Sequence, residues 1–148
     1  MEEIDLEIPK YEIDEWISIL KPYQREIIIN LVDKYGAEEA INQWMMANGP
    51  VDTVKFGGMP DNEKSKFSDR FKDEINKFIC GHPSYSKYRE EYLKLNEGTK
   101  TALVTSISSF LGAKLGVSVS ILAPAIVLTL YLVGKMGINA YCSVIEFD

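Results

Sequence analysis

Apolar side chains recur three or four residues apart over most of this chain, and the pattern breaks at glycine and proline residues. This spacing places apolar residues on one face of an α-helix. The breaks predict helices at about residues 13–20, 22–35, 37–47, 61–80, 85–97, 101–115 and 120–141. Short connections between successive helices are typical of a helical bundle. The sequence therefore predicts an all-α fold, one compact domain of six to seven helices.

The second predicted helix begins at Pro22, which suits a first-turn position, and ends before Gly36. Its apolar positions follow helical spacing, and we expect them to form one buried stripe. That stripe comprises Ile27, Ile28, Leu31, Val32 and Tyr35.

Residues 115–134 contain no charged side chain, although most of the preceding chain is densely charged. A run of about 18 apolar residues is long enough to span a membrane. Pro124 fits best in the first turn of a helix, which would then begin near Ile121 and leave fourteen uncharged residues up to Gly134. Fourteen residues span about 21 Å, less than the hydrocarbon layer of about 30 Å. We therefore expect this helix at the centre of the bundle, with these apolar members: Ile121, Leu122, Pro124, Ile126, Val127, Leu130 and Val133.

The alternative is a membrane protein or a membrane-acting effector. Residues 101–142 hold two apolar helices in succession, which could form an insertable hairpin. The segment GAKLG at residues 112–116 has the small-xxx-small spacing of packed membrane helices. An inner-membrane location accompanies this alternative.

Residues 1–12 form an acidic arm in which acids alternate with aliphatic side chains, namely Ile4, Leu6 and Ile8. Alternation with a period of two predicts an extended segment that could add to a partner's sheet edge, and a frayed chain end is the simpler interpretation. Residues 1–15 hold seven acids and one base, which accounts for the net charge of −6. No segment supplies a basic face, and this argues against nucleic acid as a partner.

Residues 51–60 interrupt the helical pattern with a Gly-Gly pair and a proline, and we interpret them as a linker. The linker separates a three-helix segment at residues 13–50 from a larger helical segment at residues 61–148. The phosphate-loop pattern is absent from it.

Tyr85, Tyr88 and Tyr92 lie on one face of the fifth predicted helix, with Lys87 and Arg89 between them. Aromatic side chains beside lysine or arginine can stack on the nucleobases of single-stranded nucleic acid. Here Glu90 and Glu91 cancel the positive charge. The spacing favours a core-facing or partner-binding stripe.

Cys80 and Cys142 are the only cysteines, and the acidic N-terminus does not resemble a signal peptide. We therefore expect two reduced thiols in a cytoplasmic protein. His82 lies two residues after Cys80 and could serve as a base or metal ligand, but a zinc site needs three or four ligands. We expect no metal ligands, no cofactor and no catalytic residues.

These observations favour a non-enzymatic protein–protein interaction module, such as an adaptor, a regulator or a small subunit of a bacterial-type complex. Its expected partner is another protein, and homo-oligomerisation is left open. A membrane-acting effector that uses the apolar hairpin is the second hypothesis, and a cysteine-dependent enzyme built on Cys80 and His82 is the third.

Overall fold

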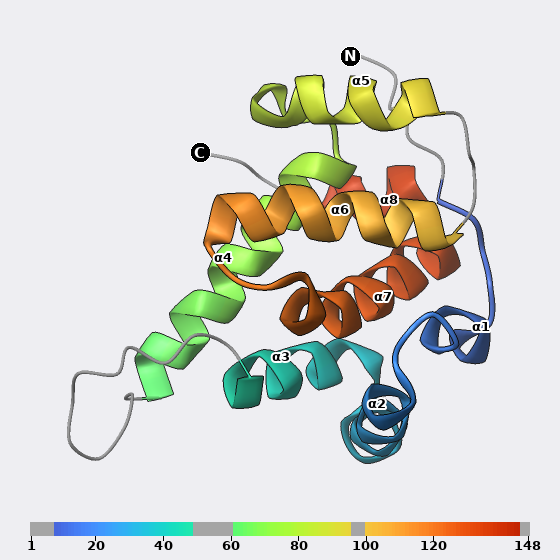
Figure 1. Cartoon of the computed structure of the whole chain (residues 1–148), viewed down its shortest axis with the longest axis vertical. Coiled ribbons are helices and arrows are strands. Elements are labelled where there is room, and N and C mark those ends of the chain that lie inside the picture. The colour runs from blue at the N-terminus through green and yellow to red at the C-terminus, as the bar shows by residue number, and fades with distance from the viewer. Residues whose placement is uncertain (1–7, 49–60, 96–99, 146–148) are drawn as a thin grey trace.

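The computed structural model describes residues 8–48, 61–95 and 100–145, and these contain α-helices, one 3₁₀ helix and no strand (Figure 1). The predicted all-α fold class is confirmed. The elements are α1 (Ile13–Ile17), α2 (Pro22–Tyr35), α3 (Ala37–Asn48), α4 (Asp61–Ile79), the 3₁₀ helix η1 (Pro83–Tyr85), α5 (Ser86–Leu95), α6 (Lys100–Leu115), α7 (Val119–Met136) and α8 (Ile138–Ser143).

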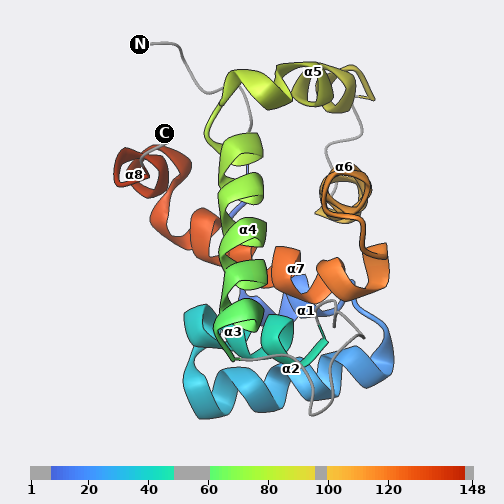
Figure 2. The same cartoon turned by 90° about the vertical axis from the view of Figure 1, so that its left-hand side faces the viewer.

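Helix α7 lies at the centre of the bundle, as the uncharged run predicts. It packs against α1, α3, α6 and α8, while α2 covers the outer side of α3 (Figure 2). Leu122 and every residue from 124 to 130 are buried, as is Val133. A helix that is apolar on all sides needs such enclosure, because water would otherwise contact its apolar surface.

The N-terminus of α7 differs from the expectation. The helix begins at Val119 after Ser118, so Pro124 lies in its second turn and not in its first. Pro124 has no N–H, which leaves the carbonyl of Ser120 without the usual donor four residues ahead. The buried Gln24 side chain of α2 supplies that donor, with its Nε2 2.8 Å from the Ser120 oxygen. The proline that we expected to start the helix thus creates an acceptor that α2 binds.

Helix α3 makes a similar contact one residue further along. Trp44 Nε1 donates to the carbonyl oxygen of Ile121 across 2.7 Å, and the Trp44 side chain is buried. Two side-chain donors, from α2 and α3, therefore hold the first turn of α7. Buried donors and acceptors are nearly always paired, so these bonds fix how the helices sit.

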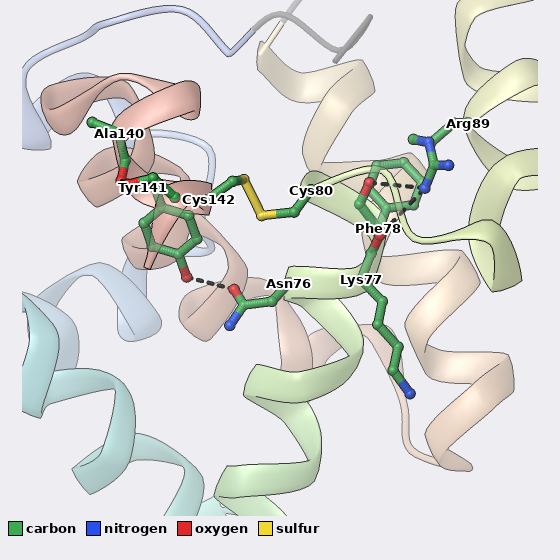
Figure 3. The surroundings of a disulfide bond; sticks show 9 residues. Asn76, Lys77, Phe78, Cys80, Arg89, Ala140, Tyr141 and Cys142 are labelled. Atoms are coloured by element: carbon green, nitrogen blue, oxygen red, sulfur yellow. Dashed lines mark hydrogen bonds between the residues drawn. A yellow bond between two sulfur atoms is a disulfide. The ribbon is translucent and has the colours of Figure 1, made fainter. Parts of the chain in front are cut away.

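The last predicted helix is two helices. Gly137 ends α7 with a φ of 93°, and α8 follows it directly. A positive φ suits glycine because other residues would be strained there. Helix α8 then turns toward the C-terminal end of α4 (Figure 3).

Cys80 and Cys142 form a disulfide with a Cα–Cα distance of 5.5 Å, so the prediction of two reduced thiols is wrong (Figure 3). The residues are 62 positions apart in the chain. The prediction rested on the expected compartment, whereas pairing depends on which ends of α4 and α8 meet in space. Beside the disulfide, the Tyr141 hydroxyl donates to Asn76 Oδ1, which adds a second link between α8 and α4.

Part of the predicted arm lies in the described structure, whereas Ile4, Leu6 and the linker at residues 51–60 lie outside the described residues. Ile8 is half-buried and packs against the core. The next residue, Pro9, crosses α7 so closely that a Cβ added to Gly134 would lie 2.6 Å from the Pro9 carbonyl oxygen. The end of the arm is thus seated on a glycine of the central helix.

Candidate functional site

The tyrosine stripe is built into the bundle. Tyr85 is fully buried, and Tyr88 and Tyr92 are half-buried against the core. The Tyr88 ring lies 5.6 Å from the Tyr85 ring and 4.8 Å from the Phe110 ring of α6, measured between centroids. These are the distances of packed aromatic pairs. The rings therefore join α5 and η1 to α6, and partner binding through this stripe stays a prediction.

The Tyr85 hydroxyl group is hydrogen-bonded to a carboxylate of α4. It donates to Glu74 Oε1 of α4 across 2.7 Å. Burial first, and then the Glu74 carboxylate, raise the pKa of Tyr85 far above its ordinary value. Tyr85 is therefore a neutral donor at physiological pH and fixes η1 to α4.

The neighbourhood of Cys80 and His82 is a capped turn. His82 Nδ1 accepts from the backbone N–H of Ser84 at 3.1 Å and lies 2.8 Å from the Ser84 hydroxyl. His82 thereby caps the N-terminus of η1. The disulfide occupies the sulfur that a nucleophile or metal ligand would need, because only a thiolate can act in either way. The hypothesis of a cysteine enzyme thus requires a reduced form of the chain.

No group of three or more His, Cys, Asp or Glu side chains within the described residues could hold a metal ion. The ion pairs among the described residues involve side chains that are at least partly exposed. Lys77 pairs with Asp73 at 3.1 Å and with Glu74 at 3.4 Å, and these contacts raise the Lys77 pKa. Such pairs on a helix surface are common and contribute little stability.

Helix α7 is, among the described residues, the one helix long and apolar enough to cross a membrane. Half of its 18 residues are buried inside the bundle. The predicted apolar members divide accordingly: Leu122, Pro124, Ile126, Val127, Leu130 and Val133 are buried, and Ile121 is half-buried. In this structure these residues make the contacts of core residues. The length and apolar composition of α7 do not distinguish a core helix from a membrane-spanning helix.

The surface feature that the sequence pattern misses lies on α2. Of the predicted buried stripe, only Ile28 is fully buried; Leu31 and Val32 are half-buried, and Ile27 and Tyr35 are 42% and 41% exposed. The prediction that all five are buried is therefore wrong. Helix α2 sits at the edge of the bundle and packs mainly on α3, so a single side of it is covered (Figure 2).

Tyr23 and Ile29 extend this exposure, at 58% and 43%. Four of the nine large apolar side chains exposed in the described part of the chain thus lie on α2. Tyr23, Ile27 and the half-buried Leu31 are four residues apart, so they follow one flank of the helix. We call these three residues the α2 stripe. Single exposed apolar residues are ordinary, but a row of them is a feature of interaction surfaces.

Helical periodicity contained a weak signal for this surface. Helix α2 has apolar or aromatic residues at eight of its fourteen positions, Pro22 included, and they are not confined to one side of the helix. The run Ile27, Ile28 and Ile29 in particular must point in three directions. Comparison with protein-family models, curated proteins and solved structures finds no match for this chain.

Proposed function

We propose that this chain is a protein–protein interaction module and that its partner binds the α2 stripe. The observation that supports the proposal most is the exposure of Tyr23 and Ile27 on one flank of a helix at the edge of the bundle. When a partner covers these two side chains, their apolar surface is removed from water, and this contributes favourable free energy to binding. Catalysis has no part in the proposal.

The partner that fits best is an amphipathic helix that lies along α2. A helix recognises a neighbour through apolar residues three or four positions apart, which is the spacing of the α2 stripe. The exposed Lys34 lies on the same flank, seven positions after Ile27, whereas Asp33 lies about 100° from Lys34 round the helix and Glu26 lies beside Tyr23, three positions after it. We expect a partner helix with acidic residues at the end that reaches Lys34.

The test compares three versions of the full chain, purified from native cells under gentle conditions. The first is wild type, the second carries Tyr23→Ser with Ile27→Glu, and the third carries Leu93→Glu. Leu93 is a matched control because it is 41% exposed and lies on α5, away from α2. A specific partner should co-purify with wild type and with the control, and be lost from the double variant.

The proposal fails if the set of co-purifying proteins is the same for all three versions. Circular dichroism and thermal unfolding check that the double variant is folded. We expect it to fold like wild type because Tyr23 and Ile27 are exposed. Light scattering of the purified chain tests the remaining occupant, a second copy of this chain. A dimer that the double variant abolishes would identify the partner of the α2 stripe as the chain itself.

The arm at residues 1–12 remains a second candidate contact. We expect deletion of residues 1–7 to weaken partner binding if Ile4 and Leu6 contribute. Unchanged binding would remove the arm from the mechanism. The cytoplasmic location also stays a prediction, and a disulfide weighs against it because disulfides persist mainly in oxidising compartments.

We propose membrane action as the alternative function, for which the composition and length of α7 are the support. In this mechanism α6 and α7 leave the bundle as a hairpin, and the disulfide restrains the adjoining α8. Reduction should then be needed for membrane binding. Sedimentation with anionic phospholipid vesicles, with and without reductant, tests this directly. Failure to sediment in either state contradicts the alternative and leaves the proposal for α2 untouched.

A further inference from the structure

A cleft of about 300 Å³ lies between the segment that joins α1 to α2 and the helices α6 and α7. Its walls include Leu20 and Lys21 from the joining segment, Thr105, Ser108 and Ser109 from α6, and Ala123 from α7. Hydroxyl groups therefore line part of the cleft, and aliphatic groups line the rest. The cleft shares none of the three residues of the α2 stripe.

One buried polar atom in this wall lacks a partner. Ser108 is only 3% exposed, and its hydroxyl oxygen makes no hydrogen bond to any residue that the structure describes. Buried hydroxyl groups are nearly always paired with protein or water. Gln24, which also lines the cleft, is engaged instead, because its amide nitrogen donates to Ser120 and its amide oxygen accepts from the Lys21 N–H. Ser108 is thus the buried polar side chain of this wall that is left for a ligand.

The charge that lines the cleft is positive. Lys21 is the only charged residue among those that line it. The cleft is also lined by the first turns of α2, through Gln24, and of α7, through Val119 and Ser120. The first turn of a helix carries N–H groups without helical partners and a partial positive charge, which favours an anion. Lysine, the first turns of α2 and α7 and an unpartnered hydroxyl therefore line one cleft.

We propose that this cleft binds a medium-chain carboxylate, with its carboxylate near Lys21 and its alkyl chain against the aliphatic wall. The Ser108 hydroxyl would donate to the carboxylate or to a water bound with it. The volume limits the ligand, because one water-sized group takes about 30 Å³ and the cleft holds about ten such groups. Octanoate, with ten non-hydrogen atoms, is the probe of matching size.

Isothermal titration of the full, oxidised chain with octanoate tests the proposal, with octanol as the uncharged comparison. We expect saturable binding of octanoate with one site, and weaker binding of octanol. Lys21→Gln should weaken octanoate binding about tenfold, the typical effect of one contact to a charged group. Lys94→Gln removes an exposed lysine of α5, outside the cleft, and should leave the binding unchanged.

A second pair of variants tests the location. Ser109→Phe places a large side chain in the cleft from an exposed position, and Ala113→Phe adds the same group on α6 outside it. We expect Ser109→Phe to abolish octanoate binding and Ala113→Phe to preserve it. The proposal is overturned if octanoate does not bind, if octanol binds equally well, or if both phenylalanine variants bind like wild type. None of these outcomes bears on partner binding through the α2 stripe.

Discussion

Gln24 and Ser120, 96 positions apart in the chain, are joined by a hydrogen bond of 2.8 Å from the glutamine amide to the serine carbonyl. The carbonyl is open to this bond because Pro124 cannot donate to it. The central helix thus combines an apolar surface with a backbone acceptor that lacks its usual helical donor. The acceptor lets α2 attach at a defined position, which apolar contact alone specifies poorly.

Replacement of Gln24 by leucine should lower the free energy of unfolding by about 1–3 kcal/mol, because it leaves a buried carbonyl without a partner. In a Pro124→Ala background, residue 124 regains its N–H, and Gln24→Leu should then cost clearly less. Urea unfolding of the four versions measures this coupling. Gln43→Leu is the control, since its side chain makes only an exposed contact with Glu39. Equal costs of Gln24→Leu in both backgrounds would contradict the role of Pro124.

The disulfide should make a large contribution to stability. It links positions separated by 62 residues, and closing a loop of that length restricts the unfolded chain by about 4 kcal/mol in the chain-entropy model. We expect reductant to lower the unfolding midpoint of wild type strongly. Cys142→Ser should show the lowered midpoint without reductant and no further response to it. A thiol assay on the denatured, unreduced wild type should find no free thiol, and two would contradict the bridge.

Helical periodicity predicts much of this fold because most helices here are amphipathic. The predicted bounds of α2, α3 and α6 lie within about a residue of the observed ones, since Gly36 and Gly116 adopt the positive φ that ends a helix. The position of α7 at the centre follows from its lack of charged residues.

Other features depend on contacts between distant segments. Ile27 and Ile28 are identical in type, yet one is exposed and the other buried, because α3 covers one side of α2 only. Which of the two faces water depends on the arrangement of helices, and a local pattern contains no such information. The pairing of Cys80 with Cys142 depends in the same way on the turn at Gly137, which directs α8 to α4. The cleft at Ser108 forms only where three segments meet.

Alkaline pH should destabilise the protein through Tyr85. Its pKa is raised in the folded state, mainly by burial, and is about 10 in the unfolded chain. Below pH 10 both states keep the proton, so the stabilisation is fully present. Above pH 10 the unfolded state loses its proton first, so the free energy of unfolding falls as pH rises.

Tyr85→Phe provides the measurement for this pH dependence. The variant should lose about 1 kcal/mol near pH 7, because the bond to Glu74 is gone, and should show a shallower decline above pH 10. Some decline should remain, since burial also raises the pKa of Tyr141. Urea unfolding at several pH values between 7 and 11 gives both quantities. Identical alkaline slopes for variant and wild type would contradict the assignment.

The contact between Pro9 and Gly134 predicts that Gly134→Ala destabilises the full chain but stabilises a chain without the arm. In the full chain, Gly134→Ala should lower the free energy of unfolding by about 1–3 kcal/mol, because the new Cβ would lie 2.6 Å from the Pro9 oxygen. In a chain that lacks residues 1–10 the obstacle is gone, and alanine should stabilise α7 by up to about 1 kcal/mol through its higher helix propensity. Unfolding curves of the four versions decide the matter. A destabilising effect of equal size in the shortened chain would show that the constraint on Gly134 comes from another neighbour and that the arm is not seated there.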